Sequence, residues 1–269
     1  MRAPRVRHRP ALIALLTAVL CALRAAGAAE LTATEARCQV RTIASARVFI
    51  GSKISCIRRC ARDAAAGRTA PAECRPPYAG TTADCIETRE ATTLRRLLTG
   101  SCRHDCPECY AGGDCSAASH ATIARVGAAI DLLVPLVYCD EPPVPDGLTL
   151  LEQQCSSHIG AELRRFALAK FTCLRLCEHR AMAGMIPPEA CTTPFTGNPN
   201  ADPATVACIA GARSRSVEHI DGTCTRDGAA LECHAGRIGA DWIGLVADAV
   251  DVEASALLCG STSGAFVVE

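Results

Sequence analysis

The sequence predicts an all-α protein built from two tandem, disulfide-stapled helical modules of about three antiparallel helices each. Two proline-free segments carry apolar residues at helical spacing, and a shift of 117 residues superposes four cysteines on four others. Only 3% of the residues are aromatic, so the core must come from smaller side chains that bury less area. Cross-links are expected to offset that deficit, because eighteen of the nineteen cysteines follow the first 29 residues.

Residues 1–29 have the layout of a secretory signal peptide. Four arginines precede an apolar run over 11–23, and the small residues 25–29 follow it, which places cleavage near Ala28/Ala29. The run is shorter than the roughly 20 residues that cross a bilayer, and we expect no transmembrane span. The mature chain is therefore expected to be secreted or periplasmic.

The charge of the mature chain argues against a nucleic-acid partner. Five of the basic residues lie in the leader, which leaves 23 basic against 28 acidic residues, a net charge of about −5. The basic residues are scattered among acids and aromatic residues are scarce, so neither phosphate binding nor base stacking is indicated.

An internal repeat divides the mature chain. Thirteen of 37 positions are identical between 38–74 and 155–191. The repeat predicts a first module over 30–139, an acidic, proline-rich linker over 140–147 and a second module over 148–269. The matched cysteines are Cys38 and Cys155, Cys56 and Cys173, Cys60 and Cys177, Cys74 and Cys191, Cys85 and Cys208, Cys102 and Cys224, Cys115 and Cys233, and Cys139 and Cys259.

Each module begins with a long helix, predicted over Thr34–Ala66 and Leu150–Gly184, in which three cysteines and a phenylalanine share one ridge. Shorter second and third helices follow. The second helices are predicted over 82–98 and 203–220, and the third over 119–138 and 241–258.

The cysteine spacing favours particular disulfides. Cysteines 18 residues apart on one helix are about 27 Å apart, too far for a disulfide, so their partners must lie on neighbouring elements. Antiparallel packing of the first two helices matches their spacings. The favoured pairs are Cys56–Cys85, Cys38–Cys102, Cys60–Cys74, Cys173–Cys208, Cys155–Cys224, Cys177–Cys191 and Cys233–Cys259. The pairing of four others stays open: Cys106, Cys109, Cys115 and Cys139.

The C-x17-C-x3-C helix, the later cysteines and the C-x-x-C segment resemble uncharacterised secreted cysteine-rich repeat proteins of high-GC bacteria. The resemblance covers nearly the whole mature chain. It implies the fold and the compartment, and it implies no activity, catalytic residue or cofactor.

Cys106 and Cys109 form the single C-x-x-C, a spacing found in redox dithiols and in metal sites. His104 and His120 are near enough in sequence to complete a metal site. In an exported chain a structural disulfide is the favoured interpretation, with metal and redox chemistry as the alternatives.

The sequence contains no catalytic motif of the common hydrolase or nucleotide-binding classes, and we predict that the protein is not an enzyme. Glu178 and His179 are adjacent on a helix and so point about 100° apart, which favours a solvated helix face over a catalytic pair. None of the six mature histidines occupies an equivalent position in both copies of the well-aligned segment. They are His104, His120, His158, His179, His219 and His234.

The chain has two lysines, Lys53 and Lys170, at equivalent positions of the long helices. A functional interpretation is that each ammonium holds an anionic ligand or an acid of the neighbouring helix. The favoured interpretation is common ancestry of the copies, with the side chain snorkelling over the ring region of Phe49 or Phe166.

The sequence as a whole predicts an exported, non-enzymatic structural or binding protein without a cofactor, whose partner is a protein or a small apolar molecule. The alternative is a saposin-like carrier of lipid or another apolar ligand. A metal or redox protein that uses Cys106 and Cys109 ranks third.

Overall fold

The computed structural model describes residues 32–100, 102–103, 106–107, 110, 114–138, 149–191, 195, 198–225, 234 and 236–257. Within these ranges the chain is helical and has no strand, which confirms the all-α prediction. The leader, the linker over 140–147 and the tail over 260–269 lie outside the described residues. The first repeat contains α2 (Ala33–Ala65), η1 (Pro71–Cys74), α3 (Gly80–Leu98) and α4 (Cys115–Tyr138). The second contains α5 (Leu150–Met182), η3 (Pro188–Cys191), α6 (Pro203–Cys224) and α7 (Gly239–Leu257).

The two long helices begin with the same local signal. The Thr32 side chain accepts a hydrogen bond from Glu35 N while the Glu35 carboxylate accepts one from Thr32 N. Thr149 and Glu152 repeat this capping box 117 residues later. Each box satisfies backbone N–H groups that a helix start leaves without partners.

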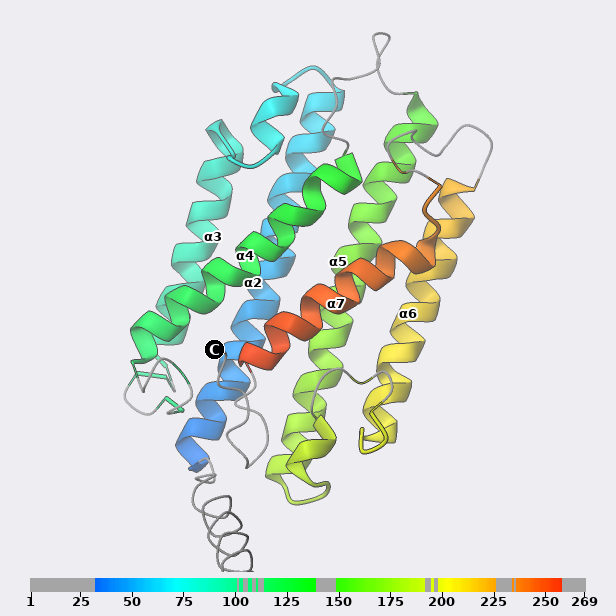
Figure 1. Ribbon diagram of the computed structural model, residues 1–269. Coiled ribbons are helices and arrows are strands. Elements are labelled where there is room, and N and C mark those ends of the chain that lie inside the picture. The colour runs from blue at the N-terminus through cyan, green and yellow to red at the C-terminus, as the bar shows by residue number, and fades with distance from the viewer. Residues whose placement is uncertain are drawn as a thin grey trace, which may run out of the picture.

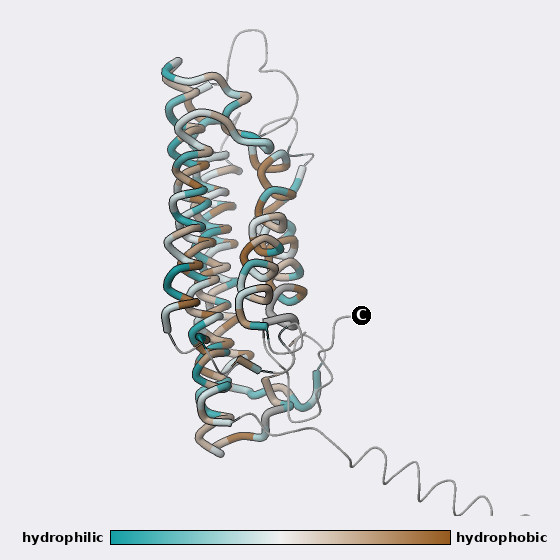
Figure 2. The backbone as a smooth tube through the Cα atoms, turned by 90° about the vertical axis from the view of Figure 1, so that its left-hand side faces the viewer, coloured by the Kyte–Doolittle hydropathy of each residue, from teal (hydrophilic) through white to brown (hydrophobic). Residues whose placement is uncertain are grey.

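The helices form two layers. Four of them lie side by side in the order α3, α2, α5, α6, and α4 and α7 cross this layer diagonally on one face (Figure 1; Figure 2 shows the layers edge-on). The long helices α2 and α5 are antiparallel, because Gly51 lies beside Leu168 whereas Arg58 lies beside Gly160. The third helices α4 and α7 also run in opposite directions (Figure 1).

Seven disulfides staple the described residues, with Cα–Cα distances between 4.8 and 6.0 Å. Six of them are pairs that the helix spacing favours: Cys38–Cys102, Cys56–Cys85, Cys60–Cys74, Cys155–Cys224, Cys173–Cys208 and Cys177–Cys191. The seventh joins Cys106 to Cys115. Four cysteines of the mature chain, and with them the favoured pair Cys233–Cys259, lie outside the described residues: Cys109, Cys139, Cys233 and Cys259.

One hydrophobic core extends through both repeats. Phe49 of α2 and Phe166 of α5 are each 1% exposed and belong to the same cluster as Trp242 of α7. The two repeats therefore share their interior across the α2–α5 interface.

Helix α4 is the one helix of the described residues that is long and apolar enough to cross a membrane by length and composition. The core helix of a soluble protein passes the same test. In this fold one face of α4 is packed into the core through Ile123 and Val126, and its Asp131 is bound by a lysine of α2.

Candidate functional site

A buried lysine–aspartate pair joins the long helix of the first repeat to its third helix. Lys53 Nζ of α2 lies 2.7 Å from Asp131 Oδ1 of α4 and donates to Gly127 O at 2.9 Å. Tyr78 OH donates to the same Asp131 Oδ1 at 2.6 Å. Burial raises the pKa of the Tyr78 phenol and the bond to Asp131 raises it further, so the phenol stays a donor.

The second repeat contains the same arrangement. Lys170 Nζ of α5 lies 2.7 Å from Asp251 Oδ1 of α7 and donates to Ala247 O at 2.7 Å. Asp131 and Asp251 are 120 residues apart, the same shift that relates Cys139 to Cys259. Burial lowers the pKa of Lys170 and raises that of Asp251, because desolvation disfavours both charges and their mutual attraction offsets only part of it.

The two ion pairs show what the ammonium groups of Lys53 and Lys170 contact. An acid of the neighbouring helix lies against each ammonium, and neither lysine snorkels to solvent, since Lys53 is 5% and Lys170 3% exposed. With a carboxylate and a carbonyl already bound, each ammonium acts as a tie between the two layers.

A cavity lies where the two repeats meet. It has a volume of about 70 Å³, is lined by α2, α4, α5 and α7, and its lining is almost wholly apolar. Many lining residues come in equivalent pairs, one from each repeat. The pairs are Ile50 and Ala167, Ile54 and Phe171, Val126 and Val246, Ala129 and Ala249, and Ile130 and Val250.

A fully buried carboxylate lies between α5 and α6 in the second repeat only. Glu162 Oε1 contacts Arg165 Nη1 at 2.5 Å, His219 Nδ1 at 3.4 Å and His158 Nε2 at 3.9 Å. Its Oε2 is buried without a hydrogen-bond partner. The equivalent residue of the first repeat is Ser45. Sequence reasoning missed this cluster, although His158, Glu162 and Arg165 share a helix face at spacings of four and three.

The cluster around Glu162 does not make a metal site by geometry. Among the residues that the structure describes, no group of three or more His, Cys, Asp and Glu could hold a metal ion. The arrangement is instead a buried acid neutralised by a guanidinium, with two imidazoles at its solvent edge.

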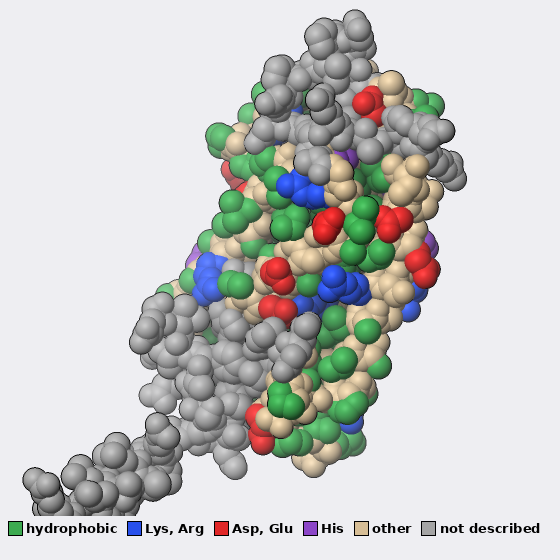
Figure 3. All heavy atoms as spheres, turned by 45° about the vertical axis from the view of Figure 1, so that its right-hand side comes forward, with side chains coloured by type: hydrophobic (Ala, Val, Ile, Leu, Met, Phe, Trp, Pro, Cys, Tyr) green, Lys and Arg blue, Asp and Glu red, His purple; other side chains and the backbone are tan. Residues whose placement is uncertain are grey.

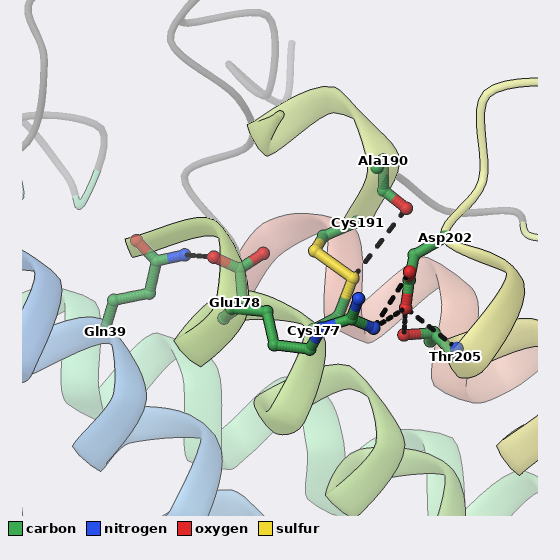
Figure 4. Close-up of a disulfide and its surroundings, with 8 residues drawn as sticks. Gln39, Cys177, Glu178, Ala190, Cys191, Asp202 and Thr205 are labelled. Carbon is green, nitrogen blue, oxygen red and sulfur yellow. Dashed lines mark hydrogen bonds and ion pairs between the residues drawn. A yellow bond between two sulfur atoms is a disulfide. The ribbon is translucent and has the colours of Figure 1, made fainter. Parts of the chain in front are cut away.

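Glu178 lies at the contact between α5 and the start of α2. Gln39 Nε2 donates to Glu178 Oε2 at 3.4 Å (Figure 4), and burial raises the pKa of Glu178 to about 7. His179 is exposed. The two side chains therefore lie in different environments, and the prediction of a solvated face is wrong for Glu178, which packs against the other repeat.

Next to Glu178, an ion pair supports the start of α6 (Figure 4). Arg180 Nη1 donates to Asp202 Oδ1 at 2.9 Å and to Oδ2 at 2.7 Å, and Asp202 accepts from Thr205 N at 2.9 Å as the helix N-cap. Burial acts to raise the pKa of Asp202, but the bonds from Thr205 and Arg180 outweigh it and lower that pKa.

The C-x-x-C segment does not close on itself in this structure, because Cys106 is bonded to Cys115. Cys109 and His104 lie outside the described residues, and His120 is exposed. His234 is buried against Trp242 and lies 3.2 Å from Val137 O of the first repeat, and its burial lowers its pKa.

We find no family model, curated protein or solved structure with a significant match to this chain. The resemblance to secreted cysteine-rich repeat proteins therefore stays a prediction from the sequence.

Proposed function

We propose that the chain is an exported, non-enzymatic binding protein whose two repeats form a rigid scaffold. This proposal rests on one observation, the disulfides and ion pairs that join the two long helices to their neighbours. Disulfides join α2 to three neighbouring segments and α5 to α6 and η3, while Lys53 and Lys170 fix the second layer. A surface whose backbone is already ordered binds a partner with little further loss of entropy.

The number of disulfides supports export. Cytosolic thiols are kept reduced, whereas secreted and periplasmic proteins form and keep such bonds. We propose that residues 1–29 direct the chain out of the cytosol and are removed near Ala28/Ala29. No nucleic-acid partner and no transmembrane anchor form part of this proposal.

The test is the intact mass of the protein after expression with its own leader in a host with an oxidising export compartment. We expect a chain that lacks residues 1–29 and weighs about 18 Da less than its reduced form, which corresponds to nine disulfides. A chain that keeps its leader and reduced cysteines would overturn the export proposal. Alkylation of Cys106 and Cys109 without reduction would shift the assignment to redox or metal chemistry.

A second candidate function is transport of a small apolar ligand, and the cavity between the repeats favours it. Its volume of about 70 Å³ is smaller than the roughly 150 Å³ of an apolar cavity that binds benzene. A larger ligand must therefore separate α4 from α7, much as stapled helices of saposin-like proteins open around lipid.

This candidate is tested with the fluorescent apolar probe N-phenyl-1-naphthylamine and the cavity-filling variant Ala249→Leu. We expect the native protein to bind the probe with micromolar affinity and the variant to bind at least tenfold more weakly while melting at no lower temperature. Absence of probe binding to the native protein, or equal binding by both, would remove the carrier function and leave the scaffold proposal intact.

A further inference from the structure

Four arginines line one groove on the side of the molecule opposite α4 and α7. The groove has a volume of about 410 Å³ and is formed by α2, α3 and α5. Ser52 and Ser55 of α2 line it, and they point roughly 100° and 200° away from Lys53, which faces α4. The arginines are Arg47, Arg59, Arg89 and Arg164.

None of the residues that line the groove is acidic. Within the part of the chain that the structure describes, no carboxylate lies within 4.0 Å of the four guanidinium groups. On the face drawn in Figure 3, acidic and basic side chains are interspersed. The groove differs from that face because its charged side chains are all basic. The mature chain carries a net negative charge, so the groove is a local concentration of positive charge on an acidic protein.

The inner part of the groove is built by the two repeats together. Arg164 Nε of α5 donates to Gly51 O of α2 at 3.1 Å, which fixes its guanidinium over the helix interface. Its equivalent Arg47 has an Nε that is buried and has no hydrogen-bond partner. Leu168 packs 3.4 Å from where a Cβ on Gly51 would lie, so the missing side chain of Gly51 shapes the groove floor.

The outer part belongs to the first repeat alone. Arg59 of α2 and Arg89 of α3 are exposed and line the groove. Leu176 occupies the position in the second repeat that is equivalent to Arg59. The positive charge of Arg59 therefore belongs to the first repeat and has no equivalent in the second.

From these observations we propose that the arginine groove is a binding site for a multiply charged oxyanion of the phosphate or sulfate type. This inference rests on the proposed binding function and names its ligand class. Planar guanidinium groups present paired N–H donors that match tetrahedral oxyanions, and several unpaired cations in one groove repel each other until an anion binds. The anion is either a free molecule or the head group of a lipid.

The first experiment is calorimetric titration of the oxidised, leader-free protein with inorganic pyrophosphate at 20 mM and 200 mM NaCl. We expect saturable one-to-one binding that weakens at least fivefold at the higher salt concentration. Arg59→Gln and Arg89→Gln, both at exposed positions, should each weaken binding at least fivefold without lowering the melting temperature. Arg47→Gln and Arg164→Gln should weaken it at least tenfold.

The matched control is Arg215→Gln, an exposed arginine of α6 outside the groove. It removes the same charge and should change the pyrophosphate Kd by less than twofold. Equal weakening by Arg215→Gln would mean that pyrophosphate senses only the overall charge, and it would overturn the site. No pyrophosphate binding by the native protein would exclude a free anion, and the proposal would then depend on the lipid head group.

A parallel arm distinguishes the two sources of the anion. Phosphatidylcholine vesicles with one-fifth phosphatidic acid are sedimented with the protein, and pure phosphatidylcholine vesicles are the comparison. Co-sedimentation that is lost in Arg59→Gln supports a lipid head group, and pyrophosphate binding without co-sedimentation supports a free anion. If the protein is exported, fully oxidised and stable yet binds neither, the groove proposal fails while the proposed scaffold stands.

Discussion

In each repeat a lysine of the long helix ties the third helix to the layer of long helices. Lys53 and Lys170 reach across the layers to an aspartate and a backbone carbonyl. Each lysine is withdrawn from water and each aspartate is partly buried, and the bond between them offsets part of the cost of that desolvation. Removing one partner is therefore more damaging than removing both.

We predict that Lys53→Met lowers the free energy of unfolding by about 2 kcal/mol, because the partly buried Asp131 loses its counter-ion and keeps the hydrogen bond from Tyr78. The double variant Lys53→Met/Asp131→Leu should lose less than the single one. Urea denaturation measures both. Arg62→Met, an exposed position on the same helix, is the control and should stay within about 0.5 kcal/mol of the native protein. A Lys53→Met loss no larger than the control would show that the pair does not hold the layers.

Glu178 makes the stability of the protein depend on pH. Its pKa rises from 4.5 to about 7 on folding, so the folded state keeps a proton that the unfolded state releases between these values. The free energy of unfolding therefore falls as pH rises from about 4.5 to about 7 and is lowest, for this group, above pH 7.

The variant Glu178→Gln removes that dependence and keeps an oxygen for Gln39. We predict that it is more stable than the native protein by on the order of 2–3 kcal/mol at pH 8 and equally stable at pH 4. The measurement is urea denaturation across this pH range. Glu189→Gln, an exposed acid, serves as control and should show no such trend. A gain that is the same at pH 4 and pH 8 would contradict the assignment to Glu178.

Several helices begin at a capping side chain. Two threonine–glutamate boxes begin α2 and α5, and Asp202 begins α6. The sequence predicted the long helices to within two residues, since unbroken apolar spacing and the glycines Gly67 and Gly184 mark their extent. The sequence reasoning did not identify the two capping boxes. Their threonines and glutamates precede the first cysteine of each repeat and are not part of the apolar pattern that predicted the helices.

We predict that Asp202→Ala destabilises the protein by about 3 kcal/mol, because the buried carboxylate caps α6 and also pairs with Arg180. Asp202→Asn keeps the cap and loses the ion pair, so it should cost about half as much. The control is Asp114→Ala at the exposed start of α4, where the carboxylate caps without an ion pair and about 1 kcal/mol is expected. Thermal melts at pH 7 rank the three variants, and an Asp202→Ala loss equal to that of Asp114→Ala would contradict a role for Arg180.

At the scale of the molecule, the two repeats do not have separate interiors. Phe171 of α5 lines the same cavity as Ile54 of α2, its equivalent residue. An isolated repeat would expose this apolar face to water. We predict that residues 148–269, expressed alone and oxidised, self-associate and do not form a stable monomer. Light scattering after gel filtration measures this, and a monomer that melts within a few degrees of the full chain would contradict it.

The sequence predicted what depends on spacing along the chain: the helices, their order and six of the disulfide pairs seen here. The sequence did not predict features that depend on how helices far apart in the chain pack together. The carboxylate partners of Lys53 and Lys170 lie 78 and 81 residues away. The arginine groove combines two arginines of α2 with one of α3 and one of α5. These arginines are far apart in the sequence, so the scattered basic residues gave no indication of an anion site.

The antiparallel contact of α2 with α5 also bears on how such a chain arose. Around the cavity many residues of one repeat are matched by their equivalents from the other, as in a twofold homodimer. A shorter ancestor with one repeat could have assembled from two identical subunits across this face before its gene was duplicated in tandem. Once the two copies are joined in one chain, each can change its sequence independently of the other. Glu162 and Glu178, which stand where the first repeat has Ser45 and Ala61, are changes that a homodimer would have had to accept twice.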